Sequence, residues 1–100
     1  MNINKTVTEE KTILALSGEM DTITASKLET ALIPEFDQTK HVELDFARLT
    51  FVSSAGLRVL LTCEKAAKAK GCRQVIVNVP ESIVEVFDIT GFSGILDIEK

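Results

Sequence analysis

The chain contains 100 residues, of which 45% are hydrophobic and 26% are charged. This composition is typical of a folded globular domain rather than a disordered chain, so we expect a single domain over residues 1–100. The net charge of −4 argues against direct binding to nucleic acid, which requires concentrated lysine and arginine. Five phenylalanines without tryptophan or tyrosine provide neither a stacking platform for bases nor an aromatic belt for a membrane.

No stretch of the sequence approaches about eighteen uninterrupted apolar residues, and the start lacks a basic region followed by a long apolar run. We therefore expect a cytoplasmic protein that does not insert into a membrane. The two cysteines, Cys63 and Cys72, form no CxxC or other metal-binding pattern. We interpret both as reduced thiols.

The first predicted element is a β-hairpin. Its two β-prone runs cover residues 3–9 and 12–17, and polar residues separate them. Gly18 is expected to end the second strand.

A helix and a third strand are predicted next. The helix should begin at Thr22 or Thr24, because a hydroxyl side chain accepts the free N–H groups of a first turn, and Pro34 should end or kink it. Residues 41–46 alternate between apolar and polar side chains, which predicts a strand. Residues 47–52 are expected to form a loop.

The following helix should be capped by Ser53 or Ser54 and bury an apolar stripe. Gly71 stands where a left-handed terminating residue is expected. Residues 74–79 are largely apolar and β-branched, which predicts a strand buried on both faces and stopped by Pro80.

The last helix is predicted over residues 81–90, with Gly91 as its terminator, and residues 94–98 are expected to add a short strand-like end. Strands that alternate with helices imply right-handed crossovers and parallel pairing. The sequence therefore predicts an α/β fold with a mixed, mostly parallel sheet of four or five strands and helices packed on it.

Functional sites in such sheets favour the C-terminal ends of the strands. Two segments fall there, residues 18–22 after the second strand and residues 50–57 after the third. We expect function to reside in these two segments.

Three motifs in this order resemble the sulfate transporter and anti-sigma factor antagonist (STAS) family. They are SGEMD at residues 17–21, FVSSAGLRVLL at residues 51–61 and VFDITGF at residues 86–92. The resemblance covers the chain from about Thr12 to its C-terminus and implies a single-domain STAS fold.

The resemblance also implies a function and a set of partners. A bacterial domain of this kind binds an anti-sigma factor with serine protein kinase activity and thereby releases a sigma factor. Phosphorylation by the kinase switches the binding off, and a serine phosphatase resets it. Neither a cofactor nor an enzymatic activity of the domain itself is implied.

By position relative to Gly56 and Leu57, the phosphoacceptor of the family falls on Ser54, and its acidic surface residue falls on Asp21. Many members carry aspartate immediately before the acceptor, whereas this chain has Ser53, which is therefore an alternative acceptor. If the two strand ends are neighbours, Asp21 lies beside Ser54. The expected partner-binding residues are Met20, Asp21, Thr22, Ser53, Ser54, Ala55, Gly56 and Arg58.

The sequence argues against two other kinds of site, a catalytic serine and a metal site. Ser54 is a poor catalytic nucleophile, because His41 is the sole histidine and lies at the far end of the preceding strand, and no GxSxG motif is present. His41, Glu43 and Asp45 share one strand face, but alternate residues stand about 6.6 Å apart, which is too far for all three to bind one metal ion. We expect neither a catalytic nor a metal site.

A non-switching alternative remains open. Similar domains act as scaffold subunits in transport or stress-signalling assemblies, and such a subunit would bind its partner regardless of the state of Ser54.

Overall fold

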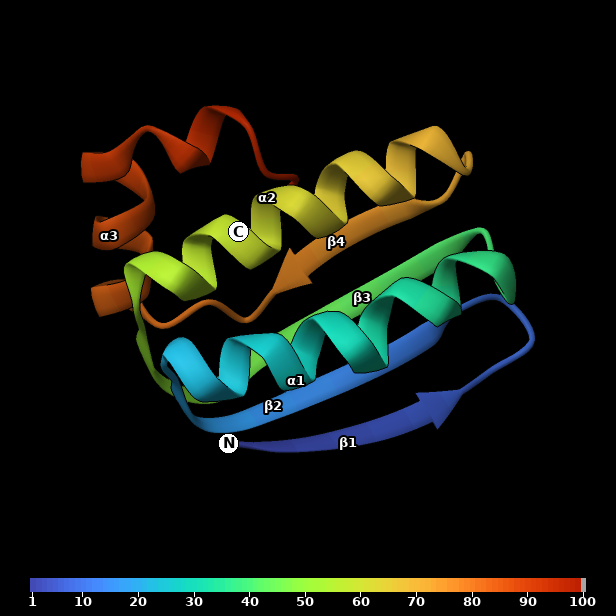
Figure 1. Ribbon diagram of the computed structural model, residues 1–100, viewed down its shortest axis with the longest axis horizontal. Helices are drawn as coiled ribbons and strands as arrows, with labels where there is room; N and C mark the ends of the chain where they lie inside the picture. Colours follow the sequence, from blue (N-terminus) through green and yellow to red (C-terminus); the bar gives the residue numbers. More distant parts are fainter. Residues whose placement is uncertain (100) are drawn as a thin grey trace.

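A computed structural model describes residues 1–99, and the elements form one mixed four-stranded sheet in the order β1-β2-β3-β4 (Figure 1). Strands β1 and β2 are antiparallel, and β2, β3 and β4 are parallel. The elements are β1 (Asn2–Val7), β2 (Thr12–Met20), α1 (Thr22–Leu32), the 3-10 helix η1 (Ile33–Asp37), β3 (His41–Val52), α2 (Ser54–Ala69), β4 (Arg73–Val77), α3 (Glu81–Thr90) and the 3-10 helix η2 (Phe92–Gly94). The predicted α/β fold with a mixed, mostly parallel sheet is confirmed.

Helices α1 and α2 lie side by side on one face of the sheet, and α3 lies beyond the C-terminal end of β4 (Figure 1). The core between these layers is built from fully buried side chains of the strands and helices. Its members include Leu14, Leu16, Leu28, Leu32, Val42, Leu44, Phe46, Leu60, Cys63 and Phe87. The rings of Phe46 and Phe87 have centroids 6.4 Å apart, so α3 is tied to β3 through this core.

Several of the local signals at turns and helix ends act as predicted. The β1–β2 turn is closed by a hydrogen bond from the Thr8 N–H to the Lys11 carbonyl, 2.8 Å long. Gly71 and Gly91 adopt φ angles of 69° and 80°, and each follows a helix. Helix α3 has the predicted bounds, and β4 is buried on both faces over residues 74–77.

The two central strands are longer than predicted. Gly18 does not end β2, which continues to Met20, and residues 47–52 are the second half of β3 rather than a loop. The pairing of β2 with β3 shifts register between Ala15 and Ser17 and again between Gly18 and Glu19. Each shift places an extra residue on β3, so the strict alternation that identifies a strand is lost although the pairing continues.

The C-terminal tail lies beside β4. Residues 94–98 do not form a named strand, but Ile98 makes an isolated parallel bridge with Ile76 of β4.

Cys63 and Cys72 are both buried free thiols, and burial raises the pKa of Cys63 to about 12. Within residues 1–99, no helix has the length and apolar character needed to cross a membrane.

Candidate functional site

The candidate site lies where β2 and β3 end next to each other. Met20 and Val52, the last residues of the two strands, are paired, and the Ser53 N–H donates to the Met20 carbonyl at 2.8 Å. Asp21 and Ser53 follow directly, and each caps a helix that starts at this edge. The two segments expected to carry function are therefore adjacent.

Ser53 is the N-cap of α2. Its backbone is extended, with φ −81° and ψ 171°, and its Oγ accepts a hydrogen bond from the Gly56 N–H at 3.1 Å. Its carbonyl accepts from the Leu57 N–H at 3.0 Å. The Ser53 side chain is half-buried and occupied by this structural role.

Ser54 is the first residue inside α2 and is exposed. Because Ser53 supplies the cap, the Ser54 hydroxyl is not needed to hold the helix start. The N-terminus of a helix carries unsatisfied N–H groups and about half a positive charge. The two adjacent serines thus differ in structure: Ser53 caps the helix and is half-buried, whereas Ser54 is exposed.

Asp21 caps α1, a role that the sequence assigned to Thr22 or Thr24. Its Oδ1 accepts from the backbone N–H groups of Ile23 and Thr24, at 3.0 and 2.9 Å. The Thr24 Oγ accepts in return from the Asp21 N–H at 2.8 Å, which completes a capping box. Hydrogen bonds from the Thr24 N–H and then the Thr24 hydroxyl lower the pKa of Asp21 below its ordinary value.

Two residues expected to contact a partner are buried. Met20 is 0% exposed and belongs to the core, so the expected surface contact by its side chain is wrong. Gly56 is also buried, and a Cβ placed there would lie 2.9 Å from the Met20 Sδ and 3.0 Å from the Val52 Cγ1. The absence of a side chain at Gly56 lets the first turn of α2 pack closely against Met20 and Val52 at the strand ends.

The other expected contact residues lie at or near the surface. Thr22 and Arg58 are exposed, and Ala55 is half-buried. Arg58 is one turn beyond Ser54 on α2 and therefore lies on the same side of the helix.

Two exposed apolar residues at this edge are absent from the expected partner-binding residues, although Phe51 lies within the predicted functional segment 50–57. Ile23, in the first turn of α1, is 73% exposed, and Phe51, paired with Glu19 near the end of β3, is 49% exposed. Phe51 faces outward because the register shifts change which β3 residues face the core. The sequence signal for Ile23 is a large apolar side chain between Thr22 and Thr24 in the first turn of α1.

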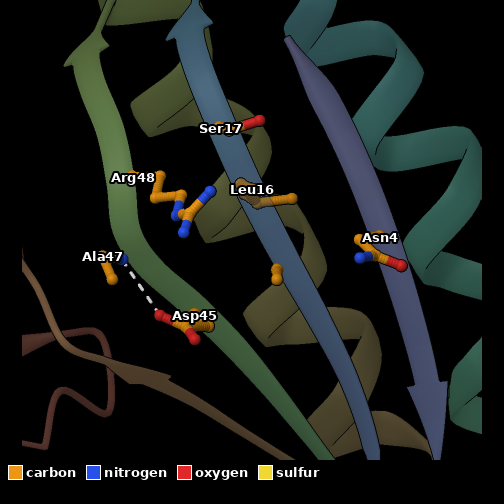
Figure 2. A pocket seen from close by; sticks show the side chains of 7 residues that line it. Asn4, Leu16, Ser17, Asp45, Ala47 and Arg48 are labelled. Atoms are coloured by element: carbon orange, nitrogen blue, oxygen red, sulfur yellow. Dashed lines mark hydrogen bonds between the residues drawn. The ribbon is translucent and has the colours of Figure 1, made fainter.

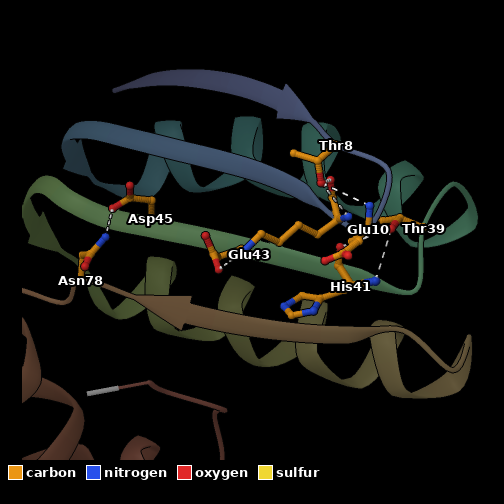
Figure 3. A network of polar contacts seen from close by, with 8 residues as sticks. Thr8, Glu10, Thr39, His41, Glu43, Asp45 and Asn78 are labelled. Carbon is orange, nitrogen blue, oxygen red and sulfur yellow. Dashed lines mark hydrogen bonds and ion pairs between the residues drawn. The ribbon is translucent and has the colours of Figure 1, made fainter.

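The polar face of β3 carries a network that links several elements (Figure 3). Glu43 pairs with Lys11 at 3.0 Å, and the Asp45 Oδ1 accepts from the Asn78 side chain at 3.1 Å. Asp45 also accepts from the Ala47 N–H at 2.9 Å. Within residues 1–99, no three His, Cys, Asp or Glu side chains are grouped closely enough to hold a metal ion.

A cavity of about 330 Å³ opens on this same polar face, lined by β1, β2 and β3 (Figure 2). Asn4, Ser17 and Arg48 contribute polar groups to it. Its lining includes none of residues 20–24 or 53–58, so it is separate from the edge that carries Ser54.

Comparison with known proteins identifies the family of this fold. The family model of the STAS domain matches residues 2–100. The chain is 30% identical over 100 residues to the anti-sigma-B factor antagonist of Bacillus subtilis (strain 168), covering 98% of this chain and 92% of that protein.

Two solved structures share the fold. The anti-sigma factor antagonist SpoIIAA in its unphosphorylated form superimposes with a TM-score of 0.81 at 20% identity, covering 99% of this chain and 89% of that one. The phosphorylated form of SpoIIAA, a cell fate determinant of Bacillus, gives a TM-score of 0.74 at 20% identity, covering 99% and 92%. The family match over residues 2–100, the relative aligned along nearly its whole length and the common fold lead to one conclusion: this chain belongs to the STAS domain family.

Proposed function

We propose that this protein is an anti-sigma factor antagonist whose partner binding is switched off by phosphorylation of Ser54. The unphosphorylated form binds an anti-sigma factor that is also a serine protein kinase, and so frees a sigma factor in the bacterial cytoplasm. A serine phosphatase returns the modified form to the binding state. The protein acts by binding and not by catalysis.

The observation that carries this proposal is the exposed residue Ser54 at the start of α2, next to the cap made by Ser53. A kinase must reach the acceptor oxygen, and a serine whose hydroxyl caps a helix is less accessible and already hydrogen-bonded. The relative from Bacillus subtilis, aligned over nearly its full length, carries the name of an anti-sigma-B factor antagonist.

The surroundings of Ser54 suit a protein partner. Ile23 and Phe51 expose apolar side chains at the same edge, beside the ionised carboxylate of Asp21. Apolar groups bordered by polar and charged ones are typical of protein interfaces. Binding would bury Ile23 and Phe51 around the serine.

The domain itself tolerates a phosphate at Ser54. The phosphate would stand at the positive end of α2, a 16-residue helix, where negative charge is stabilising. Gly56 and Met20 lie beneath the backbone of this turn, so modification at the surface leaves their packing unchanged. We expect the same fold in both states.

The partner meets a different surface after phosphorylation. The phosphate adds about 1.5 to 2 negative charges in the middle of the contact, near the carboxylate of Asp21. Two like unit charges about 4 Å apart repel by roughly 4 kcal/mol at an effective dielectric constant near 20, and about 1.4 kcal/mol already means a tenfold loss of affinity. Even a screened repulsion is sufficient to release the partner.

The decisive experiment is phosphate transfer from ATP to the purified protein by its partner kinase, with the modified residue mapped by mass spectrometry. We expect one phosphate on Ser54 in the wild type and in Ser53→Ala, and none in Ser54→Ala. The Ser53→Ala variant is the matched control, because it removes the neighbouring hydroxyl and leaves Ser54 in place.

Binding of the anti-sigma factor is then measured by calorimetry before and after phosphorylation. We expect loss of binding in the phosphorylated wild type and unchanged binding in Ser54→Ala treated with kinase and ATP. Binding that persists after complete phosphorylation would instead identify a non-switching scaffold subunit. Phosphate on Ser53 alone would identify Ser53, the capping residue, as the phosphoacceptor.

A further inference from the structure

Arg58 is an exposed cation on α2, one turn after Ser54, and none of the ion pairs within residues 1–99 involves it. On the surface of a helix, a side chain meets the residues three and four positions away. For Arg58 these neighbours are uncharged: Ser54, Ala55, Leu61 and Thr62. The Arg58 guanidinium therefore has no anion beside it on its own helix while Ser54 is unmodified.

The geometry of an α-helix directs the Arg58 side chain toward Ser54. Every Cα–Cβ bond in a helix tilts toward the helix N-terminus, so a long side chain covers the turn that precedes its own residue. The two residues are about 6 Å apart along the helix axis, at about 1.5 Å per residue. The Cβ atoms of such a pair are about 5 to 6 Å apart. The Arg58 guanidinium is therefore within reach of a group attached to the Ser54 Oγ.

An ion pair with the same spacing is present farther along α2. Glu64 and Lys68 are four positions apart, and the Lys68 Nζ lies 3.6 Å from the Glu64 Oε2. The acidic residue precedes the basic one, which is the more favourable order for a helical pair. Ser54 and Arg58 have this spacing, and a phosphate on Ser54 would give them this order of charge.

The chemistry of the two groups is complementary. Phosphorylation of a serine adds three strong acceptor oxygens and about 1.5 to 2 negative charges. A guanidinium is planar and presents two parallel N–H donors, which match two phosphate oxygens better than the single ammonium of a lysine does. The N–H groups of the first turn of α2 favour the same anion. A phosphate on Ser54 would thus have donors both at the helix start and on Arg58.

We propose that Arg58 binds the phosphate on Ser54 within the same molecule, an inference that rests on the proposed phosphorylation of Ser54. Two guanidinium N–H groups donate to two phosphate oxygens across one turn of α2. The pair holds the phosphate in one position on the helix surface and stabilises the phosphorylated form of the domain. Arg58 compensates part of the added charge, and the remaining negative charge repels the partner.

The test installs phosphoserine in place of Ser54 during synthesis of the ¹⁵N-labelled full chain, by genetic code expansion. The side-chain N–H signals of Arg58 are compared by NMR with those of the unphosphorylated protein. We expect them to shift and to exchange more slowly with water in the phosphorylated form, whereas the signals of Arg73, at the start of β4, stay unchanged. Because no kinase is involved, unchanged Arg58 signals overturn the pairing without bearing on the proposed switch.

Variants separate this pairing from a structural role of Arg58. In the phosphorylated protein, Arg58→Gln should lower the unfolding temperature by about 2 to 4 °C, and Arg58→Lys should lower it less because the charge is kept. In the unphosphorylated protein, Arg58→Gln should have little effect. The matched control is Lys65→Gln, an exposed position about 16 Å beyond Ser54 on the same helix, which should act equally in both forms. Equal losses from Arg58→Gln in the two forms contradict the proposal.

Discussion

The two ends of α2 handle polar groups in opposite ways. At its start, the Ser53 hydroxyl caps the helix, Asp21 caps the adjacent α1, and Ser54 is exposed. Toward its end, the Glu64 Oε1 on α2 and the Gln74 Oε1 on the neighbouring β4 are buried without a hydrogen-bond partner within the described residues. The first arrangement costs little stability, whereas buried acceptors without a partner destabilise the fold.

This difference separates a surface suited to modification from a buried structural position on one helix. A modification site must be reached by an enzyme and must not disturb the fold, so it belongs at an exposed position next to satisfied caps. The comparison can be tested at each end.

The largest expected effect is at the exposed serine. Ser54→Glu places a negative charge at the contact surface, so affinity for the anti-sigma factor should fall on the order of 100-fold, about 2.7 kcal/mol. Calorimetric titration measures this change. Thr62→Glu, on an exposed position farther along α2, is the matched control and should bind like the wild type.

Gly56, which is buried in the first turn of α2, should be the next most sensitive position. Gly56→Ala brings a Cβ within 2.9 Å of the Met20 Sδ, and such overpacking costs about 1 to 3 kcal/mol of unfolding free energy. Urea denaturation provides the measurement. The same change at Gly94, where a Cβ meets nothing within 4 Å, should have little effect.

A rescue experiment checks the cause of that loss. If the clash with Met20 is responsible, adding Met20→Ala should make the cost of Gly56→Ala clearly smaller than it is in the wild-type background. Additive losses in the double variant would mean that Gly56 matters for another reason.

The adjacent serines should then separate stability from modification. Ser53→Ala removes the N-cap and should cost about 1 kcal/mol of unfolding free energy. Ser54→Ala should change that free energy by less than about 0.5 kcal/mol. Equal losses in the two variants would show that both hydroxyls hold the helix start.

The smallest expected effect is a pair of pH dependences with opposite signs. The pKa of Asp21 is lowered from 3.8, so its stabilising contribution is present above that pH and is lost as the pH falls through the folded-state pKa. The pKa of Glu64 is raised from 4.5, chiefly by burial and against the opposing charge of Lys68. Its ionisation therefore destabilises the fold as the pH rises from 4.5 through the folded-state pKa.

Urea denaturation between pH 3 and 7 resolves the two contributions. The stability difference between the wild type and Asp21→Asn should shrink toward pH 3, whereas Glu64→Gln should gain on the wild type toward neutral pH. A Glu64→Gln curve parallel to that of the wild type would mean that this carboxylate is solvated.

Much of the fold follows from local signals in the sequence. The bounds of α3, the terminating roles of Gly71 and Gly91 and the buried strand β4 depend on residues close together in the chain, so their patterns predict them. The motif around Ser54 likewise identified the segment that carries the candidate site. Local pattern is sufficient wherever a segment's structure depends mainly on its own residues.

Other features were decided only when distant segments met. The second half of β3 is recognised as a strand only from its pairing with β2, because the register shifts remove the alternation of apolar and polar residues that marks a strand. Met20 was assigned to the surface by its neighbours in sequence, but Gly56 allows α2 to cover it. The exposure of Ser54 beside the capping Ser53, and the unpaired oxygens of Glu64 and Gln74, likewise depend on where helices and strands come together, which no short stretch of sequence contains.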